Sequence, residues 1–560
     1  MFRNEYLTEW TIFKWLKYSS IDSFNRRICC IAYFWLWQFS KKMPIFALRS
    51  CLRGRKGSLC YQITIFMNTL VRFVLRGMVL SVCLSLSVWT FAAEVVSANN
   101  LSESFVPIEL THQITHVQPM TGLVLWRDHD RMAQYQHTIS MEFHYCLPCR
   151  VVTGKTDGKI DYDWTYLEDI LNDISSRGHQ AIIRFRYEYP NNTEVDGKRG
   201  TTAVPQYIKE RNDYKETYSA NPGGDGPTYY ADWSDGELQW FTLQFYKDFA
   251  TRYNNDQRIA FLEVGFGHWS EYHIYGTTLQ LGTNFPSKDY QKAFLQHLDT
   301  TLQMPWAISI DAADKTYTPI VNSEELMAIA FGLFDDSFMH KGHEIGSGDG
   351  YNERNWNAIG KGTRWQNGVC GGEISYYTSQ DQKNFLNPAG MYGVKWESAA
   401  AKYRISFMIA NDAPGGTYGT VERFAEAGMA TGYRLLVTHC VTNGEETRLT
   451  VYNEGVAPLY RDAYFAIGTV VSSTTLRGLL PKEQRDVVIP AALTNGDALH
   501  VVSPYILPTQ EIEFRAGAIP EGVSGVMEDT KHVIGKKEIQ DGQVVISYQG
   551  DTYLLSGARR

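Results

Sequence analysis

Eight short β-type runs, with helical stretches between them, constrain the fold more than any other feature of the sequence. A helix is expected from Asp163 to Arg177, because Asp163 is a suitable N-cap, apolar side chains recur on one face and Gly178 follows. A second helix is expected over residues 237–253. The alternation predicts a (β/α)8 TIM barrel, an α/β fold, and the competing topology is a doubly wound open sheet. The eight runs are GLVLW (122–126), ISMEFHY (139–145), QAIIRFRY (180–187), RIAFLEVGF (258–266), WAISI (306–310), MAIAFGLF (327–334), GVCGGEI (368–374) and ISFMIA (405–410).

The pattern changes near Gly432. From there to about Arg515, short β-type runs are separated by Asn-Gly and single Gly residues, and the helical periodicity is lost. This texture is typical of an antiparallel β-sandwich. We therefore expect a TIM-barrel domain over residues 105–430, a C-terminal β-sandwich over 431–515 and a short β-tail over 516–560.

Two segments precede the predicted barrel. Residues 67–98 combine Arg72 and Arg76 with a short apolar run and then small residues, which is typical of a secretory signal peptide. The apolar run is too short for a membrane anchor, because a spanning helix needs about 20 residues. Residues 1–66 are basic and aperiodic, so we interpret them as a translation artefact or a disordered extension. The expected protein is bacterial and exported to the periplasm, the cell surface or the extracellular space.

Charge is distributed unevenly along the chain. The whole sequence has a formal net charge of −8, but from Asn99 onward it carries 40 basic and 57 acidic side chains. Such an acidic body repels nucleic acid and anionic membranes, so neither is expected as a partner. The sequence does not indicate an oligomeric state.

Four of the nine Cys residues lie after the predicted signal peptide. Cys146 and Cys149 form a C-x-x-C pair, CLPC, directly after an expected strand. Redox pairs of the thioredoxin type begin a helix instead, so a structural disulfide between these two residues is the favoured interpretation for an exported chain. A zinc site would need a second cluster of ligands, and the sequence offers none.

Two Glu residues lie after the carboxyl ends of expected strands, where a barrel presents its chemistry. Glu271 follows the fourth strand, in GFGHWSEYH (265–273), and Glu373 ends the seventh, in CGGEISYY (370–377). Hydrolysis of a glycosidic bond uses two carboxyl groups, about 5–5.5 Å apart for retention and about 6.5–9.5 Å apart for inversion. Because the strand ends of a barrel converge, residues this distant in sequence can meet.

Other charged residues near these strand ends have structural or binding interpretations. Glu263 lies within the fourth strand, and a buried carboxylate needs a partner, for which Arg184 or Arg186 on the third strand is suited. Asp335 and Asp336 follow the sixth strand. Since adjacent strand residues point to opposite sides, only one of these two can face the cleft and bind substrate.

Five segments carry a resemblance to known proteins: RGHQAIIRF (177–185), GFGHWSEYH (265–273), FGLFDDSF (331–338), GGE (371–373) and NEGVAPLYRD (453–462). Together they resemble an uncharacterised family of exported barrel proteins with a C-terminal sandwich, which is similar to the retaining clan of barrel glycoside hydrolases. The resemblance implies that Glu271 is the acid/base and Glu373 the nucleophile. Ser270 departs from the clan, in which Asn usually precedes the acid/base.

The resemblance implies a carbohydrate substrate, and sugar rings present an apolar face on which aromatic side chains can stack. The chain is thus expected to be an exported, cofactor-free retaining glycoside hydrolase that acts on a poly- or oligosaccharide. The residues expected to bind substrate are Arg184, His268, Trp269, Tyr272, Asp335, Asp336, Trp365 and Tyr376.

Two other functions stay open from the sequence. A non-catalytic glycan-binding protein can use the same scaffold, because a fold does not fix a function. A metal-dependent enzyme would use His268, Glu271 and His273, although neither these residues nor HKGHE (340–344) match the His-Glu-x-x-His helix of zinc hydrolases. No Gly-x-Ser-x-Gly elbow and no Gly-rich phosphate loop in a suitable context is present, which argues against serine hydrolysis and nucleotide chemistry.

Overall fold

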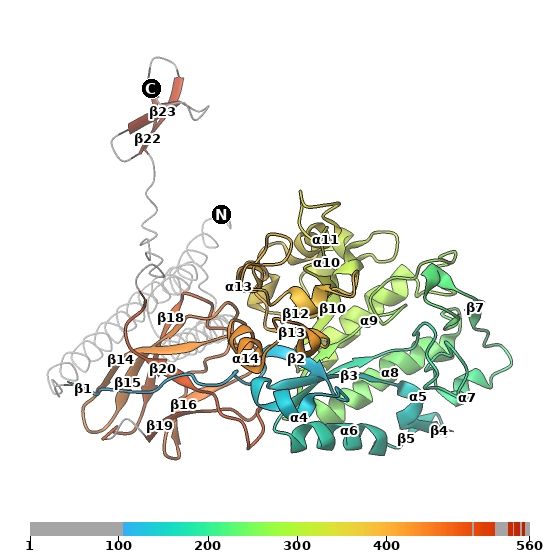
Figure 1. Cartoon of the computed structure of the whole chain (residues 1–560), viewed down its shortest axis with the longest axis horizontal. Helices are drawn as coiled ribbons and strands as arrows, with labels where there is room; N and C mark the ends of the chain where they lie inside the picture. The colour runs from blue at the N-terminus through green and yellow to red at the C-terminus, as the bar shows by residue number, and fades with distance from the viewer. Residues whose placement is uncertain (1–104, 495–497, 521–535, 541–542, 549–550, 555–560) are drawn as a thin grey trace, which may run out of the picture. The chain divides into compact units, whose positions relative to one another are not determined.

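The computed structural model of the chain describes residues 105–494 and 498–520, together with three strands of the C-terminal tail (Figure 1). The predicted extension (1–66) and signal peptide (67–98) lie outside the described residues. Within the described part of the chain, no helix has both the length and the apolar character needed to cross a bilayer.

Eight parallel strands form a closed barrel. They are β2 (Gly122–Trp126), β3 (Met141–Cys146), β6 (Gln180–Phe185), β9 (Ile259–Glu263), β10 (Trp306–Ser309), β11 (Gly332–Phe338), β12 (Cys370–Ile374) and β13 (Phe407–Ile409). Each strand pairs with the next in chain order, and β13 closes the ring by pairing with β2, which brings Ile409 opposite Val124 (Figure 1). The predicted (β/α)8 barrel is confirmed, and the alternative open sheet is wrong.

Helices and two small hairpins occupy the connections between barrel strands. The hairpins pair β4 (Val152–Thr156) with β5 (Lys159–Tyr162), and β7 (Thr217–Ser219) with β8 (Thr228–Tyr230). The helices are α4 (Met132–Tyr135), α5 (Pro148–Val151), α6 (Thr165–Ser176), α7 (Gln206–Lys209), α8 (Gly236–Tyr253), α9 (Lys288–Thr301), α10 (Glu324–Met327), α11 (Tyr351–Gly360), α12 (Asp381–Asn384), α13 (Trp396–Tyr403) and α14 (Val421–Met429).

Several predicted boundaries differ from the structure, and two of the differences have a clear local cause. Helix α6 begins at Thr165, although Asp163 still caps it in part, since its Oδ1 accepts a hydrogen bond from the Thr165 N–H at 3.0 Å. The sixth barrel strand begins at Gly332 and not at Met327. Met327 is the last residue of the short helix α10. The side chain of Ser323 caps this helix, because it accepts a hydrogen bond from the backbone N–H of Leu326.

Apolar side chains fill the barrel between its strands. Phe143, Ile182, Phe261, Phe334 and Phe407 are at most 1 % exposed and belong to one continuous core cluster. The rings of Phe261 and Phe407 stack with their centroids 5.5 Å apart. This layer makes the barrel a packed core and not a pore.

Two β-sheets follow the barrel in the sequence and pack on each other. The larger sheet contains β1 (Val106–Pro107), β14 (Leu435–Thr442), β15 (Thr447–Asn453), β18 (Gln484–Ile489) and β20 (Phe514–Ala516), and the smaller contains β17 (Val470–Val471), β16 (Tyr464–Ile467) and β19 (Leu499–Val502). Their strands are antiparallel except for β14 and β20, which are parallel. Phe465 and Phe514 contact each other between the sheets, with ring centroids 5.1 Å apart. The predicted C-terminal sandwich is thereby confirmed.

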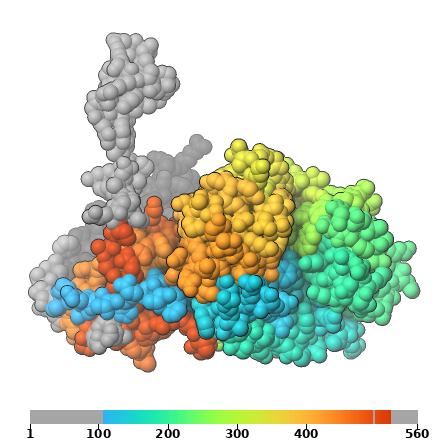
Figure 2. Space-filling model, in the orientation of Figure 1, coloured from blue at the N-terminus to red at the C-terminus, as the bar shows by residue number. Residues whose placement is uncertain are grey.

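The first described residues join this sandwich. Strand β1 pairs with β14, so the segment that begins at residue 105 adds an edge strand to the sandwich before the chain enters the barrel. Figure 2 shows this blue segment lying across the orange and red surface of the sandwich. In the tail, β21 (Lys536–Gln540), β22 (Gln543–Tyr548) and β23 (Asp551–Leu554) form an antiparallel sheet.

The sandwich contacts the amino-terminal ends of the barrel strands. Gln180, the first residue of β6, donates from Nε2 to the Tyr505 carbonyl at 2.9 Å. Tyr460 donates from its hydroxyl to the carbonyl of Trp365, in the segment before β12, at 2.6 Å. Apolar residues of the barrel interior and of the sandwich belong to the same core cluster. The sandwich therefore closes one end of the barrel, and the carboxyl ends of the strands are the end left for chemistry.

Replacing Phe261 by Ala tests the packed interior. Phe261→Ala is expected to lower the free energy of unfolding by about 3–5 kcal/mol, because it leaves a cavity under Phe407. Urea denaturation followed by tryptophan fluorescence measures the change. Tyr218→Ala, at a side chain that is 52 % exposed, is the control and is expected to change stability by about 0.5 kcal/mol or less. Equal losses in both variants would contradict the packed interior.

Candidate active site

Charged side chains form a second layer inside the barrel, above the apolar one. Successive inward positions on a strand are two residues apart. Moving two residues toward the carboxyl end from Ile182, Phe261 and Phe334 therefore changes the inward side chain from apolar to charged. The charged members of this layer are Arg184 (β6), Glu263 (β9), Asp336 (β11) and Glu373 (β12).

Arg184 holds this layer together. Its guanidinium is 0 % exposed, and Nη2 lies 2.6 Å from Glu263 Oε2, whose side chain is equally buried. Its Nη1 lies 2.7 Å from Asp336 Oδ2 and 3.5 Å from Glu271 Oε1. The predicted pairing of Glu263 with Arg184 is thus confirmed. One guanidinium contacts three carboxyl groups, so its single positive charge cannot neutralise all three if they are ionised.

The loop after β9 folds back on the strand end and so positions Glu271. A Cβ at Gly265 would lie 1.9 Å from the Ser270 carbonyl oxygen, so this close approach requires glycine. Trp269, Ser270 and Tyr272 have positive φ angles of 52°, 62° and 64°. Left-handed non-glycine residues cost of order 1–3 kcal/mol each and occur mostly where the surrounding structure requires them. The loop therefore carries strain at the position where Glu271 meets Arg184.

The environment raises the pKa values of the carboxyl groups. Burial, and then the negative charge of Asp336, raise the pKa of Glu271 well above its ordinary value, although Arg184 opposes the shift. Burial and Asp336 likewise raise the pKa of Glu373 to about 8. Trp126 opposes this second shift, because its Nε1 donates to Glu373 Oε1 at 3.3 Å. Carboxyl groups with strongly shifted pKa values cluster at functional sites, so Glu271 and Glu373 are candidates for acid/base chemistry.

A histidine and an aspartate flank Glu271. His273 lies in the same loop, and Asp311 lies in the short 3-10 helix η3 (Ile310–Ala313) after β10. Nδ1 of His273 is 2.7 Å from Asp311 Oδ2. One possible ligand atom from each of the three side chains lies within 4.8 Å of the others.

The metal-dependent alternative left open by the sequence named His268 as a ligand, and the structure does not place His268 in this group. His268 is 0 % exposed, and its Nε2 shares a hydrogen bond of 2.9 Å with the Tyr230 hydroxyl. Asp311 takes its place beside Glu271 and His273. Because His268 lies behind this group, the prediction that it contacts substrate is also corrected.

Aromatic side chains surround the charged layer. Trp269 is partly exposed and meets Tyr189 edge to face, with centroids 6.2 Å apart. Tyr376 is 48 % exposed, and after burial the charge of Glu373 is the main influence that raises the pKa of its phenol, which places the two groups close together. Trp269 and Tyr376 are therefore positioned as the sequence analysis expects of sugar-binding residues.

The two consecutive aspartates point to opposite sides of β11. Asp336 faces the barrel interior and Arg184, with a side chain that is 8 % exposed. Asp335 faces outward and is fully engaged, because Oδ2 accepts from His343 at 2.9 Å and Oδ1 from Asn352 at 2.8 Å. The expectation that only one of them faces the site is confirmed, and the substrate-binding prediction for Asp335 is corrected.

Two aromatic residues expected to bind sugar lie elsewhere. Tyr272 is 0 % exposed and packs edge to face on Phe266 in the core between barrel and helices, because its left-handed backbone turns the side chain inward. Trp365 lies at the amino-terminal end of β12, where Arg404 covers its ring and Tyr460 binds its carbonyl. Neither side chain can reach a ligand at the carboxyl ends of the strands.

The predicted disulfide is absent, because Cys146 and Cys149 are both free thiols. Cys146 ends β3 and is buried in the core, whereas Cys149 lies in α5 and packs against Leu147, Val195 and Ala203. The strand ends and a helical turn begins between the two residues, so their side chains point into different clusters. The spacing alone did not determine this geometry.

Three residues of the site were not singled out from the sequence. Trp126 ends β2 and contacts Glu373, while Asp311 follows β10 and contacts His273. Tyr189 follows β6 and packs against Trp269. All three follow the same rule that identified Glu271 and Glu373, because they end or follow a barrel strand at its carboxyl end.

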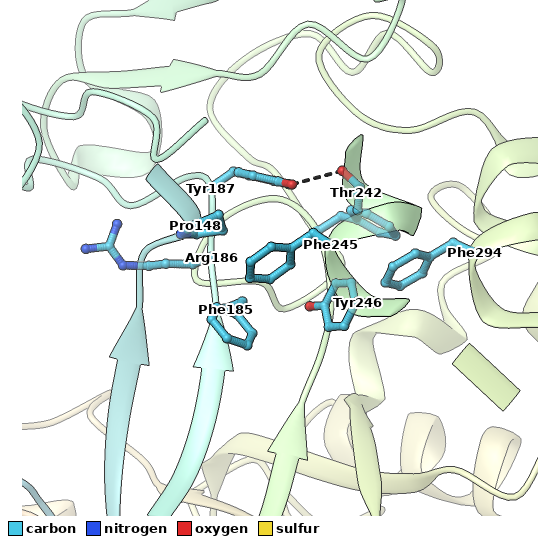
Figure 3. A pocket seen from close by; sticks show the side chains of 10 residues that line it. Pro148, Phe185, Arg186, Tyr187, Thr242, Phe245, Tyr246 and Phe294 are labelled. Carbon is cyan, nitrogen blue, oxygen red and sulfur yellow. Dashed lines mark hydrogen bonds between the residues drawn. The ribbon is translucent and has the colours of Figure 1, made fainter. Parts of the chain in front are cut away.

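A separate small cavity lies between β6 and the helices α8 and α9 (Figure 3). Phe185, Phe245, Tyr246 and Phe294 line it, and Arg186 points away from these rings. The hydroxyls of Tyr187 and Thr242 share a hydrogen bond of 2.9 Å beside it. Its lining is mainly aromatic and includes no carboxyl group, so the candidate site is the charged layer.

Comparisons with known proteins give distant structural similarities only. No family model and no curated protein matches the chain. Among solved structures, an endo-glycoceramidase II from Rhodococcus sp. is 10 % identical, covers 68 % of this chain and 100 % of its own, and has a TM-score of 0.37. A family 39 glycoside hydrolase from Bacteroides cellulosilyticus WH2 is 9 % identical, with 69 % and 83 % covered and a TM-score of 0.35. A GH39 β-xylosidase from Caulobacter crescentus is 12 % identical, with 64 % and 83 % covered and a TM-score of 0.34.

The glycine at the start of the Glu271 loop gives a direct test of this geometry. Gly265→Ala is expected to displace the loop and to lower the free energy of unfolding by about 1–3 kcal/mol, because the new methyl overlaps the Ser270 carbonyl. Thermal unfolding followed by circular dichroism measures the loss. Gly236→Ala, at the first residue of α8 where a methyl meets no neighbour, is the matched control and is expected to be neutral or stabilising. An undisturbed Gly265→Ala protein would contradict the described loop.

Proposed function

We propose that the chain is a glycoside hydrolase that acts on a poly- or oligosaccharide with retention of configuration. One observation carries the proposal: the carboxyl groups of Glu271, Asp336 and Glu373 gather at the carboxyl end of a closed barrel, around a single guanidinium that is already bonded to Glu263. Such a layer holds one carboxyl protonated beside another that can be ionised, and glycosidic cleavage uses that pair.

In the proposed mechanism, Glu373 is the nucleophile and Glu271 the acid/base. The Glu373 carboxylate attacks the anomeric carbon while Glu271 gives its proton to the leaving glycosidic oxygen. In the second step water attacks the same carbon, Glu271 takes a proton from that water, and the bond to Glu373 breaks. Asp336 favours the protonated form of Glu271 between turnovers, because its charge raises the pKa of Glu271.

Two further parts of the proposal concern substrate and location. Trp269 and Tyr376 are the side chains proposed to stack on sugar rings, since both are accessible beside the carboxyl groups. Export is supported by the signal-like composition of residues 67–98.

Replacing each proposed catalytic residue tests the mechanism. Glu271→Gln is expected to lower kcat by about 10²–10⁴-fold, because the amide cannot supply a proton, and Glu373→Gln is expected to lose at least as much. Hydrolysis of a polysaccharide panel measures the loss, and nuclear magnetic resonance of the first-formed anomer tests retention. Glu397→Gln, at a side chain that is 45 % exposed, is the control. Full activity in both glutamine variants would overturn the proposal, and an inverted product would overturn the nucleophile.

The pH dependence of kcat/KM tests the role of Asp336. Glu373 must be ionised to attack, so kcat/KM is expected to rise as the pH passes its pKa of about 8. Asp336→Asn removes a negative charge and is expected to move this rise to lower pH by about one unit or more. Asp335→Asn is the matched control, since Asp335 points away from the site. An unchanged profile in Asp336→Asn would contradict the proposed coupling.

A non-catalytic glycan-binding protein is the second candidate. The contact of Glu271 with Arg184, at 3.5 Å, favours it, because a guanidinium stabilises the ionised carboxylate and not the acid. Isothermal calorimetry with the panel distinguishes the two candidates. Binding of a glycan by wild type without any product, and equal binding by Glu373→Gln, would establish this second function.

A further inference from the structure

The side chains of Glu271, His273 and Asp311 converge from two neighbouring barrel loops. One oxygen or nitrogen from each lies within 4.8 Å of the other two. The three side chains are 16 %, 17 % and 19 % exposed, so an ion from solvent can reach them. They are placed by the loop after β9 and by η3 after β10, whose strands are adjacent in the barrel.

The donor set selects a class of ion. One imidazole nitrogen and two carboxylate oxygens suit Zn²⁺ and related transition metals, whereas Ca²⁺ and Mg²⁺ prefer oxygen alone. Zinc lies about 2.0–2.2 Å from such ligands, and the three ligand atoms, which lie within 4.8 Å of one another, are near enough to surround one ion. Small side-chain rotations therefore complete the site, and three protein ligands leave a coordination position open.

The surroundings of the three side chains carry more carboxyl groups than positive charges. Asp336, whose side chain is 8 % exposed, lies against Glu271 and adds a further carboxyl group beside the three ligands. Arg184 is the one cationic side chain that contacts Glu271 among the described residues. Carboxyl groups therefore outnumber the positive charges around the three ligands.

We infer that Glu271, His273 and Asp311 bind a divalent transition-metal ion, with Zn²⁺ as the ion that fits the donor set. The ion would bind to the carboxyl group of Glu271, which is the acid in the proposed function. Zinc binding and hydrolysis therefore exclude each other, and Zn²⁺ is an inhibitor of the enzyme. This inhibition rests on the proposed function, whereas the binding of the ion does not.

Direct binding is measured on the full chain after removal of bound metal with a chelator. Isothermal calorimetry with ZnCl₂ is expected to give one site per chain, and Co²⁺ is expected to give visible absorption bands of a site with fewer than six ligands. Asp311→Asn is expected to weaken Zn²⁺ at least tenfold and to abolish the Co²⁺ bands. His273→Gln, a second variant, is expected to do the same if Asp311→Asn folds poorly. Asp314→Asn, in the same loop, is the matched control and is expected to bind as wild type.

The inhibition is measured separately, on whichever glycan the protein hydrolyses. Zn²⁺ is expected to inhibit wild type and Asp314→Asn at the concentrations that saturate the calorimetric site. Zinc binding without hydrolysis of any glycan would support the metal site and overturn the proposed function. Hydrolysis without a saturable zinc site, or with equal binding in Asp311→Asn and His273→Gln, would overturn the metal site alone.

Discussion

The contact between Arg184 and its surrounding carboxyl groups is the interaction on which the rest of the site depends. The guanidinium is wholly buried and bonds to Glu263 and Asp336 while it also contacts Glu271. Removing one partner of such a pair leaves an uncompensated buried charge, which costs about 3–5 kcal/mol. Arg184 thus fixes where the acidic side chains lie. Its single positive charge cannot neutralise all of them, so the carboxyl groups it leaves unneutralised can take part in proton transfer.

The barrel provides this arrangement through strand geometry. Inward side chains two residues apart form an apolar layer and then a charged layer, so that packing positions the reactive groups. The loop that carries Glu271 adds a second constraint, because Gly265 permits the close approach of the Ser270 carbonyl and three left-handed residues surround the glutamate. Rigid strands and one strained loop together define the site.

Sequence reasoning recovered the features that follow from strand ends. The barrel, an arginine of the third strand as partner of Glu263, and the rule that only one of Asp335 and Asp336 faces inward all follow from alternation and from the cost of a buried charge. It failed where the backbone leaves regular geometry. The left-handed turn that buries Tyr272 and the helical turn that separates Cys149 from its expected partner depend on contacts with distant segments, which a local pattern does not contain.

The sandwich seals the amino-terminal face of the barrel with shared apolar side chains and with bonds such as that from Tyr460 to Trp365. The two sheets and the ring of strands therefore share one hydrophobic core, and an edge strand of the sandwich comes from the segment before the barrel. Removing the sandwich would expose the apolar amino-terminal end of the barrel to solvent and would promote aggregation. Engineering of this scaffold must therefore treat both halves as inseparable.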